Sequence, residues 1–183
     1  MTDFILSVDN TLLEWIQNNL RCNFLDVIMP LITRLGDNGL IWIIIAVIFI
    51  VLKKYRTDGV TMLLALVLCV LIGNLGLKPL VARARPFALN PEITLLIPRP
   101  SDFSFPSGHT MSSFAAATVI FCKDWRMGIW AGLLAAVIAF SRLYLYVHYP
   151  SDVLGGGVIG IMLGLVAVFI LTAIIKKGGK QHA

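Results

Sequence analysis

Three short clusters of polar residues could do chemistry in a chain that is otherwise almost continuously apolar. Each cluster lies at the end of a long apolar stretch, where a helix would leave a membrane. The clusters read Lys78-x6-Arg85-Pro86, Pro106-Ser107-Gly108-His109 and Ser141-Arg142-x5-His148-x3-Asp152. Together they supply three fixed cations, two histidines and a carboxylate. This combination suits a site that binds a phosphate group and attacks its phosphorus atom.

The third cluster carries the candidate nucleophile. Asp152 follows His148 by four residues, so its carboxylate can accept the N–H of one imidazole nitrogen and leave the other as a free, more basic lone pair. That is how a histidine becomes a nucleophile. Arg142 precedes His148 by six residues and can approach the same site from the end of a helix. Taken alone, the cluster is also typical of an interfacial His–Asp pair with a snorkelling arginine.

The first two clusters supply phosphate ligands and an acid. Lys78 and Arg85 are seven residues apart, or two helical turns, so we expect them on one face of a helix that the following proline ends. Ser107 can cap the next helix, whose free N–H groups are a ready phosphate site beside Gly108. His109 is placed to give a proton. By itself, the first cluster could be a pair of cations that snorkel to the membrane surface. The second cluster by itself could be an ordinary helix cap followed by a structural histidine.

The composition places the chain in a membrane. Of its 183 residues, 58% are hydrophobic and 14% are charged, against about 25% charged in an average soluble domain. So few charges with so much apolar surface indicate a bilayer as the solvent. Many cations behind the net charge of +5 lie at the ends of apolar segments, which argues against a nucleic-acid partner. We expect one domain over 1–183 with its motif core at 78–152, and no cofactor or bound metal.

Helices must position the clusters, and the apolar pattern predicts an all-α integral membrane bundle. Residues 4–20 repeat apolar side chains at helical spacing, which predicts an amphipathic helix in the membrane interface. The run 24–35 is short for a span and is expected to form a short or re-entrant helix. Clearer spans are predicted at 40–52, 60–77, 110–122, 128–145 and 153–175. We therefore expect five to six transmembrane helices plus the amino-terminal interfacial helix.

These spans place the three clusters on one side of the membrane. The cations without another evident role lie on the other side, at 53–56, 123–126 and 176–180. The positive-inside rule assigns that second side to the cytoplasm. We therefore expect a multi-pass protein of the cytoplasmic membrane whose polar clusters face outward.

The three clusters resemble the signature of the type 2 phosphatidic acid phosphatase superfamily, membrane lipid phosphatases related in their active site to vanadium-dependent haloperoxidases. The match is complete at all three motifs, and the size resembles small bacterial undecaprenyl diphosphate and phosphatidylglycerophosphate phosphatases. The resemblance implies that His148 attacks phosphorus to form a phosphohistidine, that Asp152 orients it, and that His109 protonates the leaving oxygen. It also implies that Lys78, Arg85, Ser107, Gly108 and Arg142 bind the phosphoryl oxygens. The sequence shows no cluster of metal-ligating carboxylates, which predicts a metal-independent reaction.

The motifs leave open which lipid phosphate or diphosphate is the substrate. The loop 86–105 carries Arg99 and Asp102, and Arg83 lies just before it. The two arginines could recognise a second phosphate, or could equally anchor headgroups. An outward site favours undecaprenyl diphosphate, a carrier recycled for envelope synthesis, over phosphatidylglycerophosphate or phosphatidate. A transporter or a non-catalytic lipid-binding protein is the alternative of a different class. A transporter would carry polar residues at midspan, whereas the notable interior one, Asn74, lies near a span's end.

Overall fold

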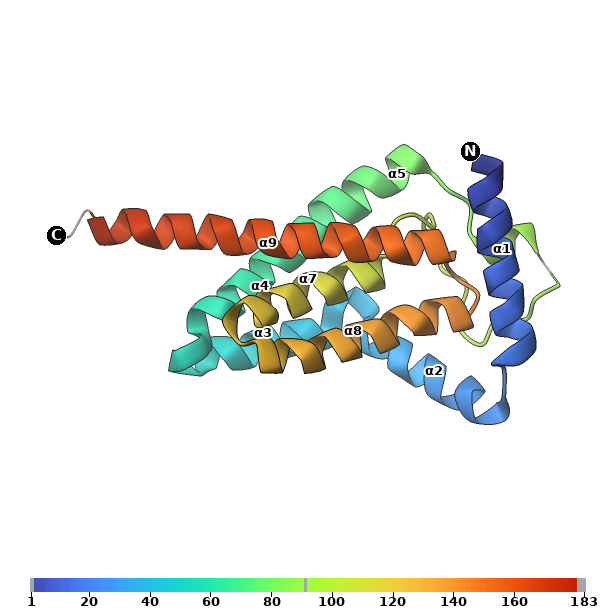
Figure 1. The fold of residues 1–183 in the computed structure, drawn as a ribbon, viewed down its shortest axis with the longest axis horizontal. Coiled ribbons are helices and arrows are strands. Elements are labelled where there is room, and N and C mark those ends of the chain that lie inside the picture. Colours follow the sequence, from blue (N-terminus) through green and yellow to red (C-terminus); the bar gives the residue numbers. More distant parts are fainter. Residues whose placement is uncertain (1, 91, 181–183) are drawn as a thin grey trace.

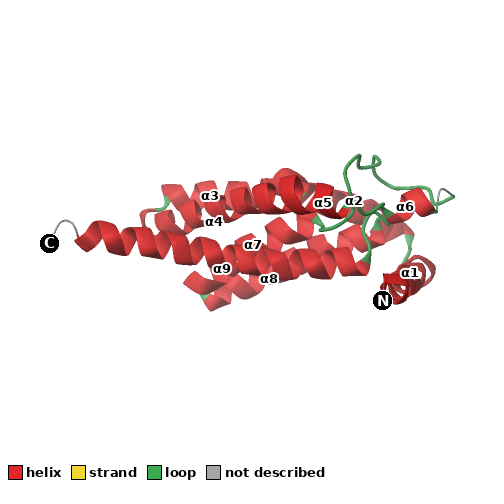
Figure 2. Cartoon of the chain, turned by 90° about the horizontal axis from the view of Figure 1, so that it is seen from above, coloured by secondary structure: helices red, strands yellow, loops and turns green. Residues whose placement is uncertain are grey.

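The computed structural model describes residues 2–90 and 92–180. Most of these residues are in helices (Figures 1 and 2). Those residues contain no strand, and the predicted all-α membrane fold is confirmed. The main helices are α1 (Thr2–Asn19), α2 (Asn23–Leu35), α3 (Leu40–Val51), α4 (Arg56–Leu68), α5 (Lys78–Val81), α6 (Pro86–Leu89), α7 (Gly108–Lys123), α8 (Trp125–Tyr144) and α9 (Pro150–Lys180). A π-helical stretch, Cys69–Leu77, joins α4 to α5.

Long apolar helices confirm a multi-pass membrane protein. Three helical stretches are long and apolar enough to cross a membrane, namely Lys53–Leu89, Trp125–Tyr144 and Pro150–Lys177. The pair Asn23–Leu35 and Asp37–Val51 is bent by 46° and makes a fourth crossing if it is counted as one span. The helix expected at 24–35 is thus the first arm of a bent pair. The total of five to six spans stays a prediction.

The helix α7 occupies the centre of the bundle, between α4, α8 and α9 (Figure 1). Facing it, α9 presents Gly156, Gly160 and Gly164 at four-residue spacing. A Cβ at Gly160 would lie 2.3 Å from the carbonyl oxygen of Met111, so only glycine permits this approach. Such stripes of small residues let membrane helices pack backbone against backbone. The contact fixes the starts of α7 and α9 against each other, where the second and third clusters lie.

The predicted amphipathic helix is present as α1, which lies across the end of the bundle and not along it (Figures 1 and 2). Leu13 and Ile16 on its buried side pack in one apolar cluster with the connection between α8 and α9. Phe4, Leu12 and Trp15 on its other side are exposed. An exposed apolar face of this kind suits a helix lying in the membrane interface.

The polar clusters and the cations without another role lie at opposite ends of the bundle, as the spans predict. The turn between α3 and α4, the turn between α7 and α8 and the carboxyl end of α9 share one end (left in Figure 1). The starts of α7 and α9 and the short helix α5 lie at or toward the other end.

Candidate active site

A cavity of about 390 Å³ at that second end gathers residues of all three clusters. The predicted site residues that line it are Lys78, Arg85, Gly108, His109, Arg142 and His148. The other two, Ser107 and Asp152, are fully buried and do not line it. The cavity is also lined by residues of α2 and of the loop 90–107, which no motif marked.

His148 and Asp152 lie side by side as their spacing predicts. Nδ1 of His148 is 3.6 Å from Oδ2 of Asp152, which is longer than a hydrogen bond but close enough for an electrostatic contact. Burial lowers the pKa of His148 to about 3 against the opposing effect of Asp152, and the charges of Arg85 and Arg142 add to the lowering. The imidazole is therefore neutral at pH 7, the form in which a ring nitrogen can attack.

Arg85 reaches the outer nitrogen of this imidazole by an unexpected route. Its Nη1 lies 3.1 Å from Nε2 of His148. The predicted helix through Arg85 is wrong, because α5 ends at Val81 and Ala82 adopts a left-handed φ of 47°. A residue before proline is disfavoured in the helical conformation, so Arg85 is extended and Pro86 begins α6 instead of ending a helix. The two cations of the first cluster therefore do not share a helix face.

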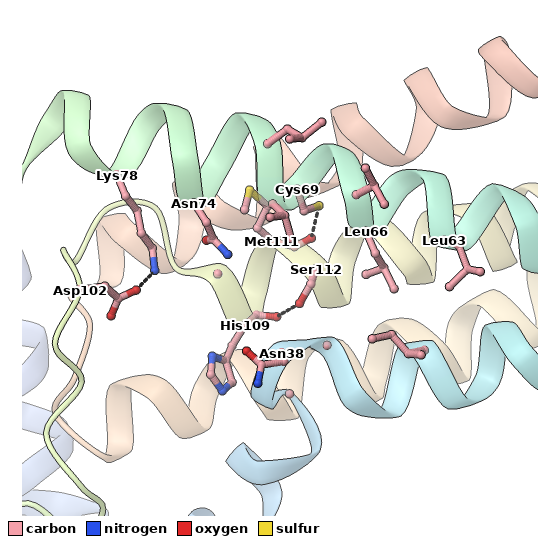
Figure 3. Close-up of a pocket in the computed structure, with 17 residues that line it drawn as sticks. Asn38, Leu63, Leu66, Cys69, Asn74, Lys78, Asp102, His109, Met111 and Ser112 are labelled. Carbon is pink, nitrogen blue, oxygen red and sulfur yellow. Dashed lines mark hydrogen bonds and ion pairs between the residues drawn. The ribbon is translucent and has the colours of Figure 1, made fainter.

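Lys78 and Arg85 nevertheless converge, because Asp102 of the loop 90–107 binds both. Nζ of Lys78 donates to Oδ2 of Asp102 (Figure 3), and Nη2 of Arg85 donates to Oδ1 at 2.6 Å. Burial raises the pKa of Asp102, but the hydrogen bond from Lys78 and the charge of Arg85 outweigh it and hold the pKa at about 2. In the sequence Asp102 is only a charged residue of a loop, since no spacing connects it to the cations.

Arg142 is buried at the end of α8 and faces the same cavity. Its Nη1 donates to Oγ1 of Thr33 on α2 at 2.5 Å, while its Nε has no hydrogen-bond partner among the described residues. A buried guanidinium N–H without a partner is suited to bind an oxyanion such as a phosphoryl group. Thr33 sits in an apolar run and carries no motif that would have marked it.

His109, at the start of α7, is paired with a carboxylate that the motifs do not contain. Its Nε2 lies 2.9 Å from Oδ1 of Asp37, in the turn between α2 and α3. Gly36 leaves room for the ring, since a Cβ there would lie 2.6 Å from Cδ2 of His109. The turn at 36–39 is predictable from its glycines, but its acidic residue could be connected to His109 only through the fold.

At the start of α7, two residues of the second cluster have different structural roles. Ser107 is the N-cap, and its Oγ accepts hydrogen bonds from the backbone N–H and the hydroxyl of Thr110. Gly108 lines the cavity, and a Cβ there would lie 3.1 Å from Oδ1 of Asn74 and 3.8 Å from Nζ of Lys78. The helix terminus is therefore open to an anion at Gly108, and a phosphate contact by Ser107 stays a prediction.

The two arginines considered for a second phosphate do not line the cavity. Arg83 binds the carboxylates of Asp9 and Asp152. Arg99 is exposed and lies over the ring of Phe87 at 5.9 Å. The additional cation that does line the cavity is Arg34 of α2.

A second, larger cavity of about 570 Å³ adjoins the first and shares Lys78, Asp102, Gly108 and His109 with it. Figure 3 shows His109 and Lys78 at one end of this cavity and apolar side chains of α4, such as Leu63 and Leu66, at the other. It is lined by α3, α4, the π-helical stretch and α7. The polar cavity thus adjoins a mostly apolar groove, whose volume is within the range typical of sites for small organic molecules.

Comparisons with known proteins agree in family and fold. The sequence model of the PAP2 superfamily matches residues 58–176. The chain is 32% identical to an undecaprenyl-diphosphatase of Sulfolobus acidocaldarius over 75% of this chain and 67% of that protein. It is also 32% identical to a lipid A 4'-phosphatase of Bacteroides thetaiotaomicron, over 93% of this chain and 80% of that protein. The fold is similar to the crystal structure of a transmembrane PAP2-type phosphatidylglycerolphosphate phosphatase from Bacillus subtilis, with a TM-score of 0.73 and 29% sequence identity. This similarity covers 94% of this chain and 87% of that chain.

Proposed function

Because the chain belongs to the PAP2 superfamily, as its motifs predict, and is a membrane lipid phosphatase, we propose that it hydrolyses the terminal phosphate of a lipid diphosphate through a phosphohistidine. The observation that carries the proposal is the position of His148, a neutral imidazole in a cation-lined cavity that adjoins a mostly apolar groove. Phosphoryl transfer needs positioning and charge stabilisation above all, and both are available here.

In the first step, Nε2 of His148 attacks phosphorus and the bond from phosphorus to the bridging oxygen breaks. His109 gives its proton to that oxygen, so the lipid product leaves protonated. Lys78, Arg85 and Arg142 stabilise the charge that spreads over the phosphoryl oxygens. In the second step a water molecule loses a proton to His109 and attacks phosphorus. The phosphorus–nitrogen bond then breaks, which releases inorganic phosphate and restores both histidines.

Undecaprenyl diphosphate is the substrate we favour. The relative from Sulfolobus acidocaldarius is an undecaprenyl-diphosphatase, and Arg34 offers a cation at the cavity for the second phosphate. A phosphomonoester lipid such as phosphatidylglycerophosphate or phosphatidate is the alternative, supported by the similarity to the Bacillus subtilis structure. We place the site on the outer face of the cytoplasmic membrane, because the cations without another role are at the opposite end.

Phosphate release by the purified protein tests the activity. We expect kcat/KM to be highest for undecaprenyl diphosphate when it is compared with phosphatidylglycerophosphate and phosphatidate under the same conditions. Equal or higher values for either monophosphate would reverse the substrate assignment. No release from any of the three would exclude all three lipids as substrates.

Trapping of the intermediate tests the mechanism. Quenching in alkali, where phosphohistidine survives, should leave labelled phosphate on the wild-type protein and none on His148→Ala. A His148→Ala variant with undiminished activity would exclude the mechanism. The described residues contain no cluster of histidine, cysteine and carboxylate side chains that could hold a metal ion, and retention of activity in EDTA tests metal independence directly.

The orientation is tested by labelling from outside intact cells. Ala88 lies on α6 at the site end of the bundle, so Ala88→Cys in a background without the native cysteines should react with a membrane-impermeant maleimide. Reaction only after the cells are opened would place the site on the cytoplasmic face.

A further inference from the structure

The carboxylate of Asp152 is held by a network that reaches the amino-terminal helix. Asp152 is 0% exposed, and its Oδ1 accepts a hydrogen bond of 2.6 Å from Nη1 of Arg83. Its Oδ2 accepts hydrogen bonds from Oγ of Ser104 at 2.5 Å and from the backbone N–H of Tyr149 at 2.9 Å. A buried carboxylate stays charged only when its oxygens are satisfied in this way.

Arg83 interacts with one oxygen of that carboxylate directly and with the other through Ser104. Its guanidinium binds Oδ1 directly, and its carbonyl oxygen accepts the backbone N–H of Ser104 at 2.9 Å. Ser104 is the residue whose hydroxyl binds Oδ2. The guanidinium also lies over the ring of Tyr149 at 4.1 Å. A displacement of Arg83 would therefore disturb every side-chain donor to Asp152.

Arg83 is in turn fixed by Asp9 of α1. Asp9 is 2% exposed and is one of the buried residues of α1, with Leu13 and Ile16. Its Oδ2 accepts from Nη2 of Arg83 at 2.7 Å and from the hydroxyl of Ser151 at 2.5 Å, and its Oδ1 accepts the backbone N–H of Ser151 at 2.9 Å. Asp9 thus holds both the arginine and the residue next to Asp152.

We propose that Asp9 and Arg83 are positioning residues for the reaction, which connect α1 to the carboxylate that orients His148. The inference rests on the proposed function. Asp152 places a negative charge behind the imidazole that becomes cationic when it is phosphorylated. Without Asp9, Arg83 is no longer fixed, so Asp152 loses its orientation toward His148 and the transition state for phosphorylation loses electrostatic stabilisation. Substrate binding is unaffected, because neither residue lines the cavity.

The test compares Asp9→Asn, Arg83→Gln and the double variant with Glu14→Gln. Glu14 is an exposed carboxylate on the same helix, so this control removes a similar charge from α1. The measurements are kcat, KM and the single-turnover rate at which the alkali-trapped phosphoenzyme forms. We expect Asp9→Asn to lower kcat and the phosphorylation rate about 10- to 100-fold, as other supporting residues behind a reactive group do. KM should change by less than about two-fold, and Glu14→Gln should match the wild type.

The double variant shows whether the two residues act through one chain of contacts. In that case it is no slower than Arg83→Gln alone, whereas independent effects would multiply. Arg83→Lys keeps the charge but cannot bind two carboxylates as a fork, so its rate should lie between those of the wild type and Arg83→Gln. If Arg83→Gln does not fold, Ser151→Ala takes its place in the cycle, since its hydroxyl joins the same two side chains.

Two results would overturn the inference. One is an Asp9→Asn protein that unfolds earlier than the wild type but phosphorylates His148 at the wild-type rate, which would make the network purely structural. The other is a double variant whose losses multiply. Failure of the proposed function is recognised separately, because the wild-type protein would then form no phosphoenzyme at all.

Discussion

Nε2 of His109 lies 2.9 Å from Oδ1 of Asp37, so the proposed acid has a carboxylate partner, as His148 has Asp152. The two pairs differ in their surroundings. Asp152 is fully buried, whereas the side chain of Asp37 is 55% exposed. A buried carboxylate suits a nucleophile that must keep one orientation. An exposed one suits an acid that gives a proton to the leaving group and takes one from the attacking water molecule in every turnover.

Replacement of Asp37 by asparagine should therefore impair protonation of the leaving group. We expect kcat on a lipid substrate to fall about 10- to 100-fold, as for other residues that orient a reactive group. The loss should shrink to less than about three-fold with p-nitrophenyl phosphate, whose leaving group needs no proton. Steady-state rates on the two substrates measure the difference.

A matched control for this substitution is Glu92→Gln, which removes an exposed carboxylate from the loop 90–107. It should leave both rates unchanged. An Asp37→Asn protein that loses the same factor on both substrates would contradict a role through His109, since a general defect of the site would explain it equally well.

The sequence predicts the parts of this site that are close in the chain. Asp152 follows His148 by four residues, and one helix end carries Arg142, so local geometry alone brings them together. Asp37, Thr33 and the remaining partners come from distant segments. Their positions depend on how α2 and the loop 90–107 pack against α7 and α8, which no periodicity describes.

The spacing in the first cluster predicts the local structure incorrectly, although its two cations do come together. A seven-residue spacing predicts a shared helix face for Lys78 and Arg85. The helix instead ends at Val81, after which Ala82 adopts a left-handed φ, and Arg85 is extended because it precedes a proline. The two cations meet all the same, because Asp102 attracts both. The charges and the motif predict that the two cations share one site. They do not predict the backbone conformation that brings the cations there.

The apolar groove should contribute to binding of the lipid chain. Val70 lines it and is partly exposed, so Val70→Trp should fill the groove with little effect on folding. We expect KM for a long-chain lipid to rise about ten-fold, which corresponds to a loss of about 1.4 kcal/mol. The kinetics of a soluble phosphate ester without a chain should not change.

Ile72→Trp is the control for the groove, since Ile72 is similarly exposed on the same helical stretch but does not line the cavity. It should leave KM for the long-chain lipid as it is in the wild type. Equal effects of the two tryptophans would mean that the groove does not receive the chain.

Arg34 should discriminate diphosphates from monophosphates. A charge-assisted contact to the second phosphate is worth about 1.5–3 kcal/mol, so Arg34→Gln should lower kcat/KM for undecaprenyl diphosphate at least about ten-fold. The value for phosphatidate should change little. Arg99→Gln, which removes an exposed arginine outside the cavity, is the control. A parallel loss on both lipids in Arg34→Gln would assign Arg34 to general attraction of anions instead.

The buried imidazole of His148 should make the fold sensitive to acid. An unfolded histidine binds a proton as the pH falls below about 6.5, whereas the pKa of His148 in the fold is about 3. Between these values the unfolded chain binds more protons, so the free energy of unfolding falls as the pH falls.

From pH 7 to pH 5 this contribution is about 2 kcal/mol, and chemical unfolding of the protein in detergent micelles can measure it. His148→Gln should lose correspondingly less stability over that interval than the wild type. Asp102→Asn is the control, because the pKa of Asp102 is held at about 2 by Lys78 and Arg85 despite its partial burial. Its stabilising charge is present above pH 4 and lost only toward pH 2, so this variant should keep the wild-type slope between pH 7 and pH 5. The same slope in His148→Gln and the wild type would show that His148 takes up its proton in the folded protein as readily as in the unfolded chain.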